Sequence, residues 1–166
     1  MQKIIVAAKS DNEVIGKDND LVWQMPADWR FFLKTIEGAY LATGRKSYES
    51  VPGKELFGLN RDFVVITRNQ QYQTEYGKVA HSIEQAIEMA ETAGADRLCI
   101  LGGAAIYEQA MDLVNTIIMT EIHAEFDGDS FFPKIDTAKW KETSRERHAK
   151  DAANPYDYSF VVWQKQ

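Results

Sequence analysis

Two short glycine-containing segments of the chain have residue types that bind phosphate groups. Residues 44–47 read Gly-Arg-Lys-Ser after the strand-like residues 40–43, and residues 101–107 read Leu-Gly-Gly-Ala-Ala-Ile-Tyr after a second strand-like run. A turn of small residues between a strand and a helix exposes backbone N–H groups to an anion. One such turn alone is more often a tight connection, and neither matches the dinucleotide or Walker pattern. Because a pyrophosphate needs donors from both sides, the pair of turns favours a dinucleotide ligand.

Asp28 is the third position whose residue type could carry chemistry. It lies in the first turn of a helix predicted to begin at Pro26, with Phe31 and Phe32 three and four positions further on. A carboxylate between aromatic side chains would be a partly dry acceptor for a planar ring that bears amide or amino groups. An Asp in a first helical turn more often complements the helix dipole and caps free N–H groups. By itself Asp28 therefore does not establish a site.

Apolar runs rich in β-branched residues predict the strands that position these groups. They lie at residues 4–6, 63–66, 98–101 and 116–120, and their continuous apolar character is typical of strands buried on both faces. One helix is predicted from Pro26 to Gly38, and another from a capping box at Ser82 and Gln85 to Gly94.

The C-terminal region has a different pattern. Residues 140–147 and 158–163 predict two antiparallel strands joined across Asn154 and Pro155. We therefore expect a single α/β domain over residues 1–166, with a mostly parallel central sheet, an antiparallel C-terminal edge and helices on both faces.

Composition narrows the possible partners and location. The 166 residues are 45% hydrophobic and contain no repeat, which fits one folded domain. Nineteen basic and twenty-five acidic residues give a net charge of -6, which disfavours nucleic-acid binding. The single cysteine, Cys99, predicts no internal disulfide and no zinc site, as in a reducing cytoplasm. No apolar run is long enough for a signal sequence or a membrane span, so we expect a cytoplasmic protein without a metal or membrane partner.

Eight short motifs follow one another along nearly the whole chain. Four of them are Val-Ile-Gly-Lys-Asp-Asn at 14–19, Trp-Gln-Met-Pro-Ala-Asp at 23–28, Gly-Arg-Lys-Ser-Tyr-Glu-Ser at 44–50 and the glycine turn at 101–107. The other four lie at residues 65–68, 120–122, 128–133 and 154–156. In this order the motifs resemble bacterial dihydrofolate reductase.

The resemblance implies hydride transfer from NADPH to the pterin ring of 7,8-dihydrofolate, giving 5,6,7,8-tetrahydrofolate for one-carbon metabolism. It implies a monomer that antifolates inhibit, with no metal. Asp28 would accept hydrogen bonds from the pterin 2-amino group and N3–H, and a water would deliver the proton to N5. The implied catalytic residues are Asp28, Trp23, Leu21 and Thr120.

The resemblance also implies which residues form the two halves of the site. Substrate would contact Val6, Ala7, Asp28, Trp29, Phe32, Val51, Leu101, Tyr107 and Thr120, with Arg61 gripping the glutamate α-carboxylate. Arg45, Thr67 and Arg68 would surround the 2′-phosphate of NADPH, and the Gly102–Gly103 bond would be cis. The implied cofactor-binding residues are Ala8, Ile15, Gly16, Gly44, Arg45, Lys46, Ser47, Thr67, Arg68, His81, Gly102, Gly103, Ala104, Ala105, Ile106 and Tyr107.

Three positions depart from the family pattern. Val22 stands where Pro is usual, so the loop 10–24, expected to close over the nicotinamide and to be steadied by residues 127–129, should be more mobile. Trp29 is bulkier than the expected aliphatic residue, and the segment 52–61 is longer than usual. Two other functions stay open: a pyrimidine reductase of riboflavin synthesis, and a catalytically silent NADPH- or folate-binding protein.

Overall fold

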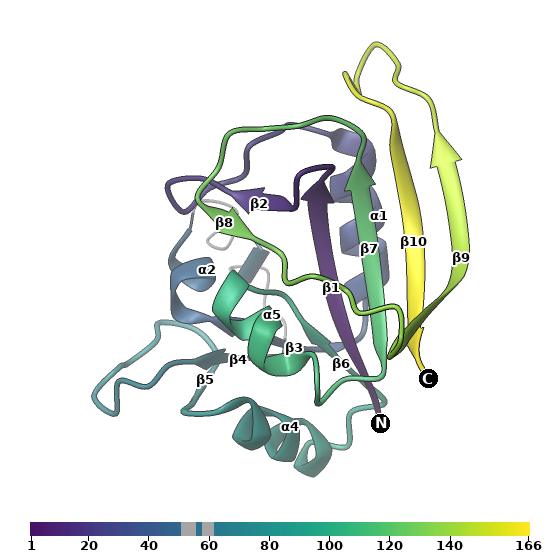
Figure 1. The fold of residues 1–166 in the computed structure, drawn as a ribbon. Helices are drawn as coiled ribbons and strands as arrows, with labels where there is room; N and C mark the ends of the chain where they lie inside the picture. The colour runs from purple at the N-terminus through teal and green to yellow at the C-terminus, as the bar shows by residue number, and fades with distance from the viewer. Residues whose placement is uncertain (51–55, 58–61) are drawn as a thin grey trace.

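In the computed structural model, which describes residues 1–50, 56–57 and 62–166, an eight-stranded sheet crosses the molecule (Figure 1). Its strand order is β5-β4-β3-β6-β1-β7-β10-β9. In this order, each strand from β5 through β4, β3, β6 and β1 to β7 pairs in parallel with the next. β10 is antiparallel to both β7 and β9. This confirms the predicted parallel sheet with an antiparallel C-terminal edge. The strands are β1 Gln2–Ser10, β3 Tyr40–Gly44, β4 Phe63–Ile66, β5 Lys78–Ala80, β6 Arg97–Ile100, β7 Thr116–Ile122, β9 Trp140–His148 and β10 Tyr158–Lys165.

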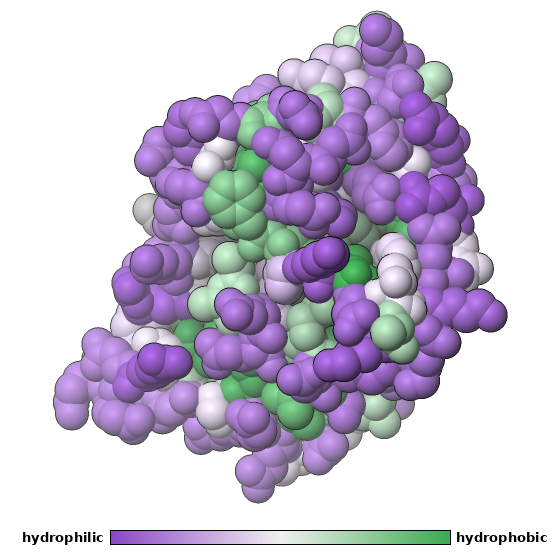
Figure 2. Space-filling view, in the orientation of Figure 1, coloured by the Kyte–Doolittle hydropathy of each residue, from purple (hydrophilic) through white to green (hydrophobic). Residues whose placement is uncertain are grey.

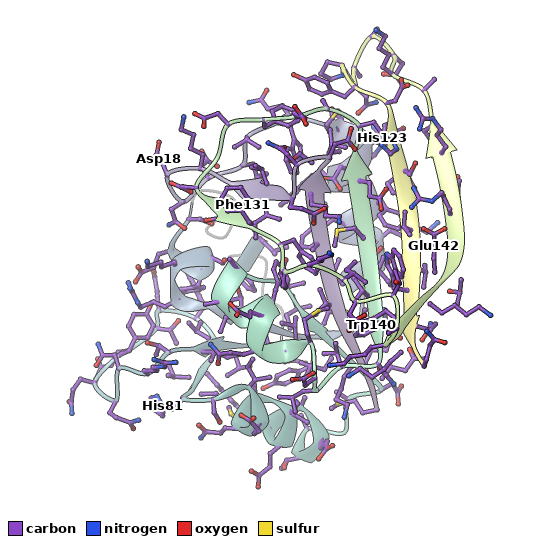
Figure 3. The ribbon with its side chains drawn as sticks, viewed as in Figure 1. Asp18, His81, His123, Phe131, Trp140 and Glu142 are labelled. Atoms are coloured by element: carbon purple, nitrogen blue, oxygen red, sulfur yellow. The ribbon has the colours of Figure 1, made fainter. Side chains whose placement is uncertain are left out.

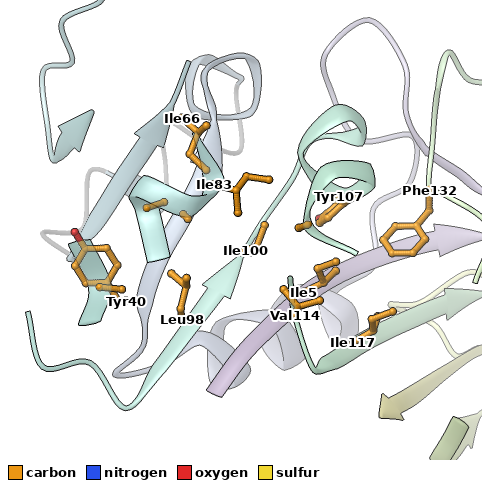
Figure 4. Close-up of a cluster of buried hydrophobic side chains, with 14 of the residues drawn as sticks. Ile5, Tyr40, Ile66, Ile83, Leu98, Ile100, Tyr107, Val114, Ile117 and Phe132 are labelled. Carbon is orange, nitrogen blue, oxygen red and sulfur yellow. The ribbon is translucent and has the colours of Figure 1, made fainter. Parts of the chain in front are cut away.

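Both faces of the sheet are covered, which explains the continuous apolar runs. In β1, Ile5 packs into the cluster under α4 (Ile83–Thr92) and α5 (Ala104–Ala110), while its neighbours Ile4 and Val6 pack on the other face. That other face is covered by α1 (Pro26–Ile36), which Figure 1 shows behind the sheet with α5 in front. Figure 4 shows the first cluster, whose members include Ile5, Tyr40, Ile66, Ile83, Leu98, Ile100 and Tyr107.

Two helices have the predicted ends. The Ser82 hydroxyl accepts a hydrogen bond from the Gln85 N–H at 3.0 Å, as in the predicted capping box. The Gln85 side chain accepts from the N–H of His81, whereas a capping box would use the N–H of Ser82. α1 ends before Gly38 and α4 before Gly94, at φ values of 76° and 75° that favour glycine. None of the helices among the described residues is both long enough and apolar enough to cross a membrane.

The first turn of α1 is capped from a distant part of the chain. Its N-cap residue, Met25, has no side-chain acceptor, and Pro26 follows it. The acceptor is Asn154, whose Oδ1 receives a hydrogen bond from the Ala27 N–H at 2.9 Å. Asn154 therefore satisfies the Ala27 N–H, while Asp28 is the acidic residue in the first turn of α1.

A small two-stranded sheet holds the loop that follows β1. It joins β2 (Val14–Gly16) to β8 (Ser130–Phe131), and Figure 3 shows Asp18 and Phe131 on this side of the molecule. The Asp18 N–H donates to the Asp129 carboxylate at 3.0 Å, and Lys17 forms an ion pair with Asp127 at 2.5 Å. The predicted contact between loop 10–24 and residues 127–129 is confirmed.

Gly128 packs closely against Val14 and Gly16 of loop 10–24. A Cβ at Gly128 would lie 2.8 Å from the Gly16 carbonyl oxygen and would also overlap Val14 Cγ1. Because backbone must move to admit it, Gly128→Ala should lower the free energy of unfolding by about 1–3 kcal/mol in urea titrations. Gly94→Ala, with no atom within 4 Å of its Cβ, is the control and should cost only its positive-φ strain. Equal losses in the two variants would contradict tight packing at Gly128.

Candidate active site

A cleft of about 950 Å³ opens at the carboxyl ends of the parallel strands. This is where open α/β sheets bind ligands, because the strand ends leave a crevice at that edge. The structure brings nearly all the site residues expected from the sequence to its lining, although Trp23 is buried beneath and Val51 and Arg61 lie outside the described residues. The expected residues that line it are Val6, Ala7, Ala8, Ile15, Gly16, Leu21, Asp28, Trp29, Phe32, Gly44, Arg45, Lys46, Ser47, Thr67, Arg68, His81, Leu101, Gly102, Gly103, Ala104, Ala105, Ile106, Tyr107 and Thr120.

The two glycine turns face each other across the ends of β3 and β6. The Gly44 N–H donates to the Gly102 carbonyl oxygen at 2.7 Å, and the Gly102–Gly103 peptide bond is cis, as expected. Gly44 and Gly103 are the N-caps of α2 (Arg45–Glu49) and α5, and neither helix start has a side-chain cap. A Cβ at Gly44 would lie 2.9 Å from Ile106 Cγ1, so the approach requires glycine. This end of the cleft is a cradle for an anion.

Cations and hydrogen-bonding groups border the glycine cradle. Arg45 Nη1 lies 2.9 Å from a carboxylate oxygen of Glu49, whose other oxygen accepts from the Tyr72 hydroxyl at 3.0 Å. Burial and the neighbouring Glu49 raise the pKa of Tyr72 to about 12, so the phenol stays a donor. Arg68 lines the same region, and His81 Nδ1 lies 2.9 Å from the Thr67 carbonyl oxygen.

Asp28 lies at the opposite, apolar end of the cleft. Protein surrounds its carboxylate except toward the cleft, and this burial raises its pKa, while polar interactions with the Thr120 and Trp23 side chains oppose the rise. The Trp23 Nε1 is buried and does not reach normal hydrogen-bond geometry with any described acceptor.

Tyr107 separates the two ends of the cleft. Its hydroxyl donates to the Val6 carbonyl oxygen at 2.9 Å, and its ring would lie 3.1 Å from a Cβ at Gly102. Burial, with the Asp28 charge as a second cause, raises the pKa of Tyr107 well above the usual range. The hydroxyl is committed to the backbone and is a poor acid.

Aromatic side chains form one wall beside Asp28. The Trp29 and Phe32 rings lie 5.4 Å apart, and the Phe31 ring stacks on Phe160 at 3.8 Å. Figure 2 shows one largely polar face, with apolar residues visible mainly across its middle. Sequence reasoning missed the cleft residues Leu56 and Phe57, because two apolar residues in a segment without periodicity give no signal.

Two further residues were missed beside the cations. Glu49 could have been found from its i,i+4 spacing to Arg45 on a predicted helix. Tyr72 could not, because its contact with Glu49 spans 23 positions and no local pattern marks it.

The arrangement can hold a dinucleotide and a planar substrate end to end. One end offers backbone N–H groups and cations, and the other offers a carboxylate between aromatic walls. No group of three or more His, Cys, Asp or Glu side chains within residues 1–50, 56–57 and 62–166 is arranged to hold a metal. Such a cleft is typical of dinucleotide-dependent oxidoreductases, in which the cofactor supplies the chemistry and the protein supplies placement.

Comparison with known proteins identifies the family. The family model described as dihydrofolate reductase matches residues 3–165, so the chain belongs to the dihydrofolate reductase family. The chain is 36% identical over 161 residues to dihydrofolate reductase from Staphylococcus haemolyticus, covering 97% of this chain and 94% of that protein. It is 35% identical over 161 residues to the Bacillus subtilis (strain 168) enzyme, covering 97% and 93%.

A solved structure agrees with this assignment. Dihydrofolate reductase from Enterococcus faecalis, complexed with NADP(H) and RAB-propyl, superposes with a TM-score of 0.89 and 29% sequence identity. The match covers 99% of this chain and 96% of that one, so the two folds agree over their whole length.

The buried carboxylate of Asp28 should make stability depend on pH. Because burial raises its pKa in the folded state, stability falls as pH rises from the unfolded value of 3.8 through the higher folded pKa. Asp28→Asn lacks this penalty, so its urea midpoint should exceed that of the wild type at pH 7, and the two midpoints should converge below about pH 4. Asp112→Asn, at an exposed position, is the matched control. A constant difference across the pH range would contradict a buried, penalised charge.

Proposed function

We propose that this protein reduces 7,8-dihydrofolate to 5,6,7,8-tetrahydrofolate with NADPH. The observation that carries the proposal is the placement of Asp28 and Thr120 at the apolar end of a cleft whose other end is the paired glycine cradle. Family membership supports the same reaction. A turnover assay that follows the loss of NADPH absorbance with and without dihydrofolate tests it.

At the apolar end, Asp28 binds and orients the pterin. An ionised carboxylate has two acceptor oxygens, which suit the paired donors of the pterin 2-amino group and N3–H. Trp29, Phe32 and Leu101 line the cleft around the pterin ring and exclude water from it. Desolvation strengthens the charge-assisted pair, so the ring is held in one orientation.

The proton for pterin N5 comes from water. Tyr107 is a poor donor because its hydroxyl is bonded to the Val6 carbonyl oxygen and its pKa is raised. Asp28 is occupied by the other side of the pterin. The Trp23 Nε1, which has no direct acceptor among the described residues, and the neighbouring Asp28 carboxylate are together suited to hold a water near this end of the cleft.

At the other end, the chain's own residues fit NADPH. The bound cofactor supplies the hydride. The N–H groups at the starts of α2 and α5, together with Lys46 and Ser47, would hold the pyrophosphate. A Cβ at Gly44 would overlap Ile106, and one at Gly103 would crowd the Ser47 hydroxyl, so glycine keeps this cradle open. Arg45 and Arg68 would hold the 2′-phosphate, and Arg45 keeps donors free beyond the one given to Glu49.

The loop 10–24 would close this arrangement from above. Leu21 lines the cleft but is 46% exposed, so closure of the loop would bury it against the nicotinamide and exclude water. We also infer that the protein acts as a monomer and that antifolates compete for the pterin end.

Asp28→Asn tests the carboxylate directly. An amide has one acceptor oxygen and an NH₂ that would face the pterin's own donors. The variant should therefore lose about 3–5 kcal/mol of transition-state stabilisation, and its kcat/KM should fall by about two to four orders of magnitude. The activity of the variant should keep rising as pH falls, whereas the wild type should level off. A near-normal rate at pH 7, or a parallel pH profile, would remove Asp28 from the mechanism.

The double variant Arg45→Ala, Arg68→Ala tests cofactor choice. Each charge-assisted contact is worth roughly 1.5–3 kcal/mol, so the preference for NADPH over NADH in kcat/KM should shrink at least tenfold. Lys141→Ala, an exposed cation on β9, is the control and should leave the ratio unchanged. Equal loss with both cofactors would refute the 2′-phosphate assignment.

A further inference from the structure

Asn154 is a buried amide that connects the C-terminal hairpin to the start of α1. It lies in the connection between β9 and β10, and only 2% of its surface is exposed. Its Oδ1 accepts a hydrogen bond from the Ala27 N–H at 2.9 Å, across 127 positions of sequence. Ala27 directly precedes Asp28, so this contact lies one residue from the carboxylate of the cleft.

Asp151 fixes which way the Asn154 amide points. The Nδ2 of Asn154 donates to the two Asp151 oxygens at 3.0 and 3.3 Å, so the amide oxygen must face Ala27. The backbone N–H groups of Asn154 and Ala153 also donate to Asp151, at 2.8 and 2.9 Å. These bonds hold the pKa of Asp151 below its usual range and keep it an acceptor.

Without Asn154, the first turn of α1 would lose the acceptor that fixes its start. Pro26 has no N–H and Met25 offers no side-chain acceptor, so Ala27 carries the first N–H of the helix that needs a partner. Asp28 does not replace this acceptor, because an acidic side chain at the third helical position reaches back to the N–H of the N-cap residue. In the structure the polar side-chain neighbours of Asp28 are Thr120 and Trp23. The bond to Asn154 therefore holds the turn that carries Asp28.

We propose that Asn154 is a positioning residue for Asp28: by accepting the Ala27 N–H, it fixes the first turn of α1 and so keeps the Asp28 carboxylate directed into the cleft. The role rests on the proposed function, in which that carboxylate meets the pterin. The Asp151–Asn154 pair thus makes the C-terminal hairpin part of the active-site support.

Two variants separate positioning from simple helix capping. In Asn154→Ala the first turn of α1 loses this anchor, so kcat/KM for dihydrofolate should fall about tenfold, and the pH at which Asp28 titrates should fall because its carboxylate becomes better hydrated. Affinity for NADPH should not change. The exchange Asp151→Asn, Asn154→Asp keeps one amide and one carboxylate in the pair. It should restore kcat/KM to within about threefold and raise the titration of Asp28, because a second carboxylate then lies nearer to it.

Asn115→Ala is the matched control. The Asn115 side chain also accepts a backbone N–H, that of Lys3 at 3.1 Å, but it precedes β7 at the edge of the sheet opposite the cleft. The Asn115→Ala variant should be less stable than the wild type, but the pH at which Asp28 titrates should not change. If Asn154→Ala behaves in the same way, the positioning role is overturned.

The titration of Asp28 is read from its carboxyl ¹³C shift without substrate, so it tests positioning even if dihydrofolate is not turned over. If the wild type does not turn over dihydrofolate but Asn154→Ala still shifts the titration of Asp28, the proposed function is overturned and the positioning role is not. If Asn154→Ala does not fold, the exchange variant decides, because it keeps an acceptor for the Ala27 N–H. An Asp28 titration below that of the wild type in it, as expected for a released first turn, would overturn the proposal.

Discussion

The parallel pairing of β3, β6, β1 and β7 is the constraint on which the rest of the molecule depends. Parallel strands bring their carboxyl ends to one edge, so the two glycine turns and Thr120 meet at a single cleft. The same pairing requires helices on both faces, because each crossover returns across the sheet. The apolar runs and the position of the cleft therefore have one cause.

Much of this could be predicted from the sequence, because its signals are local. Continuous apolar runs identify strands covered on both sides, and Gly38 and Gly94 mark helix ends through their positive φ values. The pair of glycine turns favours a dinucleotide ligand, because a pyrophosphate needs donors from both sides, and the sheet order places β3 beside β6. Long-range contacts leave no such signal. Tyr72 at Glu49 and Asn154 at Ala27 depend on folded geometry, as does the fact that a distant amide caps the helix that carries Asp28.

The electrostatics of the cleft run against those of the whole chain. A net charge of -6 opposes anionic ligands in general, yet backbone N–H groups, Arg45 and Lys46 make one end locally positive. At the other end, burial penalises the Asp28 charge. A ligand that brings paired donors relieves this penalty, so part of its binding energy comes from satisfying a group that destabilises the free fold.

The supports of the cleft come from segments distant in sequence. Loop 10–24 is held by residues 126–129, and the start of α1 is held by the connection after β9. That connection is in turn anchored by the hairpin, where Arg145 pairs with Glu121 of β7 and with Glu142. Exposed ion pairs contribute little individually, but here they lie on a hairpin already aligned by its ladder to β7. The antiparallel edge therefore serves the site as well as closing the sheet, because the connection between β9 and β10 supplies the acceptor for the Ala27 N–H in the first turn of α1.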